Sequence, residues 1–152
     1  MSTKQHDVEV ILKLYELRRD EMVRRARNWY FSEFNPESAK DIVKLMLSSP
    51  EQSAYYRMIT SYWDMAASFV NHGAIEAEMF NDTVGEHMMV FAKIEPYLAE
   101  LREMWHEPKA FYHLEKVILD RPNGAEKLKA TQEWMKDIQA KMAGGQTSEA
   151  SA

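Results

Sequence analysis

The sequence predicts an all-α fold, an irregular bundle of five to seven helices around one central buried helix. Apolar residues recur at helical spacing in successive segments, and most glycines and prolines fall between those segments. No long stretch alternates polar and apolar residues, as a half-buried strand would. The 152 residues, 45% of them apolar, suffice for one domain with its own core. We therefore expect a single helical domain over residues 1–145 and a disordered polar tail over 146–152.

The first helix is predicted over residues 7–31, with Asp7 capping its amide groups. Its apolar residues recur at spacings of three, four or seven, which places them on one face. These residues are Val8, Ile11, Leu12, Tyr15, Met22, Ala26 and Trp29. A second helix is expected after residues 32–35, with Asn35 as its cap and Pro36 in its first turn.

The central helix has the clearest sequence signals. Ser49 and Gln52 form a capping box around Pro50, which suits the first helical turn. The helix is expected to end at residue 71 or 72, where Gly73 supplies the left-handed conformation that closes a helix. Apolar residues surround most of its circumference, which is typical of a helix buried at the centre of a core.

The remaining segments are also predicted to be helical. A short piece over 75–81 precedes a longer helix, for which Thr83 and Glu86 form a capping box and which Pro96 should kink. Pro108 is expected to open a further helix, and residues 121–124 form a turn. The last helix is expected to end at the glycines at 144 and 145.

One polar stripe interrupts the apolar surface of the central helix. Its members follow at spacings of four, three, four and three, so they lie along one line: Arg57, Ser61, Asp64, Ser68 and Asn71. The preferred interpretation is a stripe that faces water. A second is pairing with a neighbouring helix or a second copy of the protein, and a third is a ligand pocket.

The first predicted helix contains five of the eight arginines: Arg18, Arg19, Arg24, Arg25 and Arg27. They could form a basic patch for an acidic partner, for RNA or for a membrane surface. The preferred alternative is internal pairing, because Asp20 and Glu21 each precede an arginine by four residues. The formal net charge of -5 argues against general attraction to nucleic acid, and no nucleic-acid partner is expected.

Catalytic and metal-binding motifs are weak in this sequence. It contains no cysteine, which fits a cytoplasmic location, and no glycine-rich phosphate loop or dinucleotide fingerprint. Glu103 and His106 have the Glu-x-x-His spacing of di-iron sites, but those sites need two such pairs. The most apolar window, residues 54–70, contains two charged side chains and is a poor membrane span. We expect no cofactor, no metal and no transmembrane segment, and we favour a protein that is not an enzyme.

From residue 53 to about residue 117 the chain resembles uncharacterised helical bacterial proteins that are known only as a domain of unknown function. The resemblance is carried by residues 62–67, by residues 73–75 with Phe80 beyond, and by residues 94–97 with Leu101 and Arg102. It implies an all-helical fold and no activity, cofactor or catalytic residue. The arginine-rich first helix and the last helix lie outside it.

These observations favour a helical protein-interaction module that forms a homodimer, through its first or its last helix. The alternative is a regulatory domain that binds a small molecule between the central helix and the helix after Thr83. Trp63, Tyr62, Phe91 and Tyr97 would form the walls of that pocket, and Arg57 or Asp64 would be its polar anchor.

Overall fold

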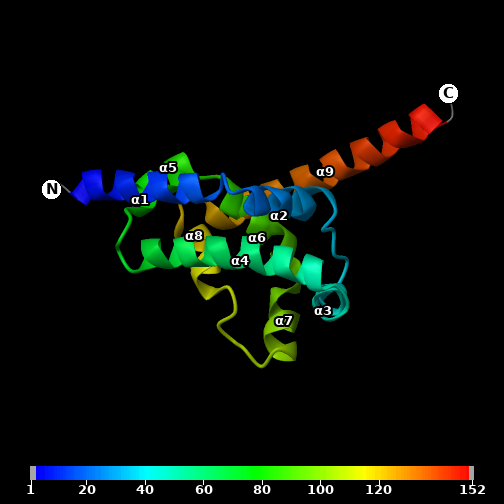
Figure 1. The fold of residues 1–152 in the computed structure, drawn as a ribbon, viewed down its shortest axis with the longest axis horizontal. Helices are drawn as coiled ribbons and strands as arrows, with labels where there is room; N and C mark the ends of the chain where they lie inside the picture. The colour runs from blue at the N-terminus through cyan, green and yellow to red at the C-terminus, as the bar shows by residue number, and fades with distance from the viewer. Residues whose placement is uncertain (1–2, 151–152) are drawn as a thin grey trace.

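The computed structural model describes the backbone of residues 3–150 and the side chains of residues 4–145. Within these bounds the chain forms helices and no strand, which confirms the predicted all-α class (Figure 1). In chain order, the helices are α1 (Thr3–Leu17), α2 (Glu21–Ser32), α3 (Ala39–Ser48), α4 (Pro50–Asn71), α5 (Ala77–Thr83), α6 (Glu86–Ile94), the 3-10 turn η1 (Glu95–Tyr97), α7 (Leu98–Met104), α8 (Tyr112–Asp120) and α9 (Gly124–Ala150). Among the described residues, no helix has the length and apolarity needed to cross a bilayer.

The centre of the bundle is α4, which packs against α2, α3, α6 and α8. Its buried residues recur at spacings of three or four and so lie on one broad face, where Trp63 is only 1% exposed. The opposite side carries the exposed residues Arg57, Ser61 and Met65. Both predicted ends of this helix are confirmed. The hydroxyl of Ser49 accepts the Gln52 amide at 3.3 Å, and Gly73 has a φ of 79°. These boundaries depend on local chemistry, so the sequence alone was sufficient to locate them.

The prediction of one helix over 7–31 is wrong, because the chain turns at residues 18–20 and forms α1 and α2. The carboxylate of Asp20 accepts the amide of Met22 at 2.9 Å and that of Val23 at 3.4 Å, so Asp20 caps a new helix. Asp7 lies inside α1 instead of capping it. Its carboxylate accepts the amide of Glu76 at 3.1 Å, which joins α1 to the start of α5.

The predicted buried face of the first helix is therefore only partly buried. Leu14 is buried in the core and Ile11 packs against it half-buried, whereas Val8, Leu12 and Tyr15 remain exposed. The turn between α1 and α2 changes the direction of the chain, so apolar spacing continued across it does not describe one face. In α2, Ala26 and Trp29 are buried as predicted, and Met22 is exposed.

Three helix starts differ from the prediction. The cap of α3 is Ser38, whose hydroxyl accepts the Asp41 amide at 3.1 Å, and not Asn35. Helix α6 begins after Gly85 without a side-chain cap, since the Thr83 hydroxyl donates to the carbonyl of Met79 in its own helix. A threonine hydroxyl can donate to the carbonyl four residues earlier in its own helix instead of accepting an amide of the next helix. For this reason the spacing between Thr83 and Glu86 predicted a cap that does not form.

The third start is that of α8, which begins at Tyr112 and not at Pro108. His106 and Phe111 both have positive φ angles, of 53° and 57°, and the segment between them forms turns instead of an α-helix. Pro96 does interrupt the preceding helix as predicted. It lies in η1, the 3-10 turn that separates α6 from α7.

The last helix, α9, starts at Gly124 and packs along α6 and α8. A Cβ atom at Gly124 would overlap the carbonyl oxygen of Ile118, so only glycine fits this close approach to α8. The helix continues through Gly144 and Gly145, where the sequence predicted its end. Glycine costs about 1 kcal/mol in a helix but does not by itself stop one. The disordered tail remains a prediction, and residues 151–152 lie outside the described residues.

Candidate functional site

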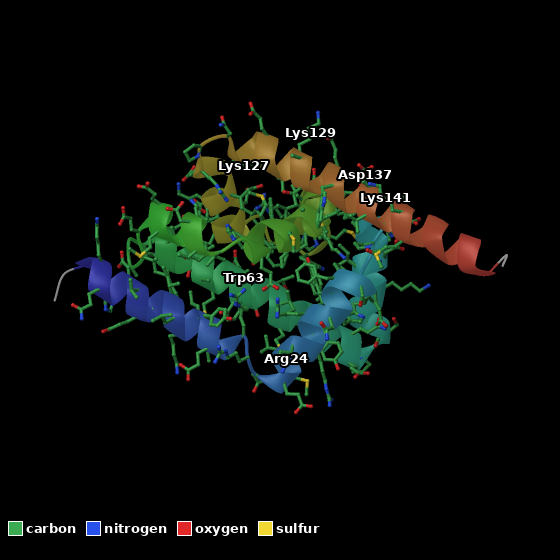
Figure 2. The ribbon with its side chains drawn as sticks, turned by 90° about the horizontal axis from the view of Figure 1, so that it is seen from above. Arg24, Trp63, Lys127, Lys129, Asp137 and Lys141 are labelled. Atoms are coloured by element: carbon green, nitrogen blue, oxygen red, sulfur yellow. The ribbon has the colours of Figure 1, made fainter. Side chains whose placement is uncertain are left out.

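The C-terminal part of α9 has an apolar row that the bundle does not fully cover. Trp134, Ile138 and Met142 are spaced four residues apart and are 55%, 37% and 63% exposed. We call these three residues the α9 stripe. In Figure 1 the end of α9 extends beyond the other helices. Ile138 and Met142 also line an open cavity between α9 and α2, so the bundle covers the stripe only in part. Asp137 and Lys141 lie on the same part of α9 (Figure 2).

Next to the α9 stripe, a cavity of about 480 Å³ lies between the end of α2, the α6–η1 junction and α9. We call it the α9 pocket. Its walls combine aromatic and methionine side chains with polar and charged ones, and two members of the stripe form part of its rim. The apolar lining includes Phe31, Met89, Tyr97, Trp134, Met135 and Ile138. A second, open cavity continues from it along α2 toward Met142.

Lys93 is a partly buried charged residue in the lining of the α9 pocket. Its ammonium donates to the carbonyl oxygens of Tyr30 at 2.8 Å and of Phe34 at 2.7 Å, and to Oδ1 of Asn35 at 3.3 Å. These acceptors belong to the last turn of α2 and the residues after it, where a cation is favoured by the helix dipole. Burial lowers the pKa of Lys93 to about 8.

Two other polar groups of the pocket are also occupied within the chain. The amide of Gln132 donates to the carbonyl of Ala92 at 3.3 Å and to the carboxylate of Glu95 at 2.7 Å. The hydroxyl of Tyr97 donates to the carbonyl of Pro36 at 2.8 Å. The polar groups of Lys93, Gln132 and Tyr97 are therefore already paired within the chain and are not free to bind a ligand.

The structure divides the polar stripe of α4. Arg57 and Ser61 are exposed, and each donates to a carbonyl of its own helix, those of Ser53 and Arg57. Ser68 likewise donates to the carbonyl of Met65 at 2.6 Å. This part of the stripe is satisfied within α4.

The other members of the stripe contact α8. The carboxylate of Asp64 accepts the amide of Leu114 at 3.0 Å, in the first turn of α8. The amide of Asn71 donates to the carbonyl of His113 at 3.2 Å and lies 3.0 Å from its Nδ1 atom. Asp64 thus supplies the cap that Phe111, at the start of α8, cannot supply.

Two arginines of the predicted basic patch converge on one buried carboxylate. Glu86, whose side chain is 7% exposed, accepts from Arg18 at 3.4 Å and from Arg27 at 2.5 Å. The indole of Trp63 donates to the same carboxylate at 3.0 Å. This group joins the α1–α2 turn and α2 to α4 and α6. The spacing of Glu86 after Thr83 predicted a capping role and did not indicate its pairing with distant arginines.

The other three arginines of the patch lie at the surface. Arg25 pairs with Glu21 at 2.9 Å, as the spacing predicted. The guanidinium of Arg19 lies 5.2 Å from the ring centre of Tyr15. Arg24 is exposed on α2 (Figure 2). The structure therefore separates the five arginines into two that form the buried group and three that remain outside.

His87 is a buried titratable residue that the sequence did not identify. It is completely buried, and within the described residues neither ring nitrogen has a hydrogen-bond partner. The rings of Phe80 and Trp63 lie 5.0 and 6.0 Å from its imidazole. Burial, with a smaller effect from Arg121, lowers the pKa of His87 to about 4. Its neutral form therefore predominates at neutral pH.

The predicted Glu-x-x-His pair and the predicted ligand pocket do not form a site among the described residues. Glu103 and His106 are both exposed, and the described residues include no group of three or more His, Asp or Glu side chains placed to hold a metal ion. Of the four proposed walls of a ligand pocket, Trp63 and Phe91 lie in the core. Tyr97 instead lines the α9 pocket.

A comparison with protein families gives one match. Residues 4–120 match the model of a family described as a domain of unknown function, DUF4760. The match extends the predicted resemblance to α1 and α2, which the sequence analysis placed outside it. It ends at the last residue of α8, so α9 lies beyond the matched region. No curated protein and no solved structure matches the chain.

Proposed function

We propose that this chain, which belongs to the DUF4760 family of domains of unknown function, is a helical protein-interaction module that self-associates through the α9 stripe. The observation that carries the proposal is the row of Trp134, Ile138 and Met142 on a helix that extends past its own bundle. The cysteine-free sequence supports a cytoplasmic module.

The apolar character of the stripe supports an interaction with protein. A contiguous apolar row on a soluble domain is typical of an interaction site, and tryptophan and methionine are enriched in such sites. The stripe has a spacing of four residues, so a second helix can lie against it along its whole length. Burial of a large apolar side chain contributes about 1.5–3 kcal/mol, and three such residues can offset part of the entropic cost of association.

Charge at the edge of the stripe supports a second copy of the chain as the partner. Asp137 and Lys141 have opposite charges and are one turn apart on α9. In an antiparallel pair of α9 helices related by a two-fold axis, Asp137 of one protomer lies near Lys141 of the partner subunit. Such an arrangement is self-complementary, as a two-fold interface requires.

Light scattering coupled to size exclusion tests this proposal. The full chain should have a dimer mass at tens of micromolar, and Ile138→Glu should convert it to a monomer. Ala140→Glu is the matched control, because it adds the same charge to an exposed position on a different side of α9. A monomer mass for the unmodified chain, or equal dissociation by the control, would contradict the proposal.

The antiparallel arrangement has its own test. Asp137→Lys and Lys141→Asp should each weaken the dimer, because each places like charges across the interface. The chain with both changes should recover the affinity, since the opposite charges are restored with their positions exchanged. Independent, additive losses in the double variant would show that the helices are not paired in this way.

A further inference from the structure

We infer that the α9 pocket is a binding site for an uncharged, ring-bearing apolar small molecule. One chain supplies every residue that lines the pocket, so the inference can hold for a monomer; Trp134 and Ile138 belong both to this lining and to the α9 stripe, and the probe experiment below is therefore read separately from the oligomer mass. The pocket volume of about 480 Å³ falls within the range of about 300–1,000 Å³ that small-molecule sites occupy. The site also lies at a junction of helices, α2, α6 and α9, where such ligands commonly bind.

The side chains of the pocket indicate the class of ligand. Phe31, Tyr97 and Trp134 line it from three different elements, so aromatic surfaces surround the space. Met89 and Met135 add polarisable sulfur atoms, which contact aromatic rings favourably. A flat ring system can meet these groups by edge or offset contacts, which are worth about 0.5–1.5 kcal/mol each beyond apolar burial.

The hydrogen bonds of the pocket indicate that the ligand is uncharged. Lys93 directs its ammonium protons to oxygen atoms of the chain, and Gln132 and Tyr97 also donate within the chain. An anionic ligand would have to displace those acceptors to reach the ammonium group. Glu37 and Lys136 also line the pocket, and because their charges are opposite they offset each other and give no net attraction for an anion. An apolar ring leaves all of these bonds intact.

The walls of the pocket are held apart by the fold. The bond between Tyr97 and the carbonyl of Pro36 fixes the segment after α2 to η1, and Gln132 fixes α9 to the end of α6. Ala92, the small residue on the α6 wall, is 4% exposed and leaves space beside it. The cavity is therefore enclosed on three sides by bonded elements, and a ligand can enter without the ordering of a flexible loop.

A pair of fluorescent probes with one ring skeleton tests the inference. N-phenyl-1-naphthylamine is uncharged, and 8-anilino-1-naphthalenesulfonate is the same skeleton with a sulfonate. We expect saturable binding of the uncharged probe, one per chain, with an affinity about tenfold or more higher than that of the sulfonate. Equal or tighter binding of the sulfonate, or no saturable binding of the uncharged probe, would overturn the inference.

Variants of the full chain locate the bound probe. Ala92→Leu should fill the pocket and weaken binding of the uncharged probe about tenfold, which corresponds to about 1.4 kcal/mol. Gln139→Trp fills the mouth from an exposed position and provides a second test should the leucine disturb folding. Ala140→Trp is its control, since Ala140 does not line the pocket. Unchanged affinity in a folded Gln139→Trp variant would place the probe elsewhere and refute the site.

Discussion

Replacement of His87 by leucine should make the stability of the fold less sensitive to acid. The imidazole is fully buried and unpaired among the described residues, and burial lowers its pKa to about 4 from an ordinary value of 6.5. The unfolded chain therefore takes up a proton as the pH falls below 6.5, whereas the folded chain does not until about pH 4. Stability is lost across that interval because the unfolded state binds more protons.

The size of the effect follows from the two pKa values. A difference of about 2.5 pKa units corresponds to about 3 kcal/mol when both states are compared below pH 4. Between pH 7 and pH 5 the same relation gives a loss of about 2 kcal/mol. At neutral pH the leucine variant should be no less stable than the unmodified chain, because it removes two buried nitrogen atoms that lack partners.

Urea unfolding at pH 7 and at pH 5 measures both quantities. Other groups that titrate in this interval are common to the two proteins, so the difference in their pH dependence isolates His87. The unmodified chain should lose about 2 kcal/mol more than His87→Leu over this interval. An equal loss in both proteins would refute the reasoning. It would mean that the imidazole is solvated or has a hydrogen-bond partner.

Substitutions at three other positions have expected outcomes. Glu86→Gln should lower the free energy of unfolding by about 3 kcal/mol in urea titrations, because two arginines lose a buried carboxylate. Asp64→Ala should cost about 1 kcal/mol by removing the acceptor of the Leu114 amide, and Asp64→Asn should cost less; urea midpoints compare the two variants. Gly124→Ala should lower the melting temperature by several degrees in a calorimetric scan, because its methyl group would overlap Ile118. A melting temperature equal to that of the unmodified chain would show that the α8–α9 junction can relax.

The central helix could be predicted because its signals are local. Ser49 accepts an amide three residues later, and Gly73 ends the helix through its own left-handed backbone conformation. Both signals involve residues that are close together in the sequence, so they can be recognised without the fold. The break between α1 and α2 could not be read in the same way. Asp20 has the spacing of an ion-pair partner for Arg24, and it also has the chemistry of a helix cap. The same side chain serves either role, and the choice depends on how α1 and α2 pack against the rest of the bundle.

The candidate site depends more strongly on tertiary structure. Trp134, Ile138 and Met142 have the apolar spacing of a buried helix face, yet the bundle covers them only in part. Which residues of a helix are covered depends on how far the neighbouring helices extend alongside it. The apolar periodicity of the helix itself does not predict the lengths of those neighbours. His87 was missed for a related reason. Its burial follows from the placement of α6 against α4 and α5, and no motif marks it.

The bonds that fix α2 have a consequence for synthesis of the chain. Arg27 bonds to Glu86, and the hydroxyl of Tyr30 donates to the carbonyl of Val90 at 2.7 Å, across 59 and 60 residues of sequence. A nascent chain cannot make these two contacts until residues 86 and 90 have left the ribosome. Until then Arg27 lacks its carboxylate partner and the ring of Tyr30 lacks its cover from α6, and such groups are available to chaperones and other nascent chains. The attachment of α2 to α6 is therefore completed only after more than half of the chain has been made, even though α2 is made early.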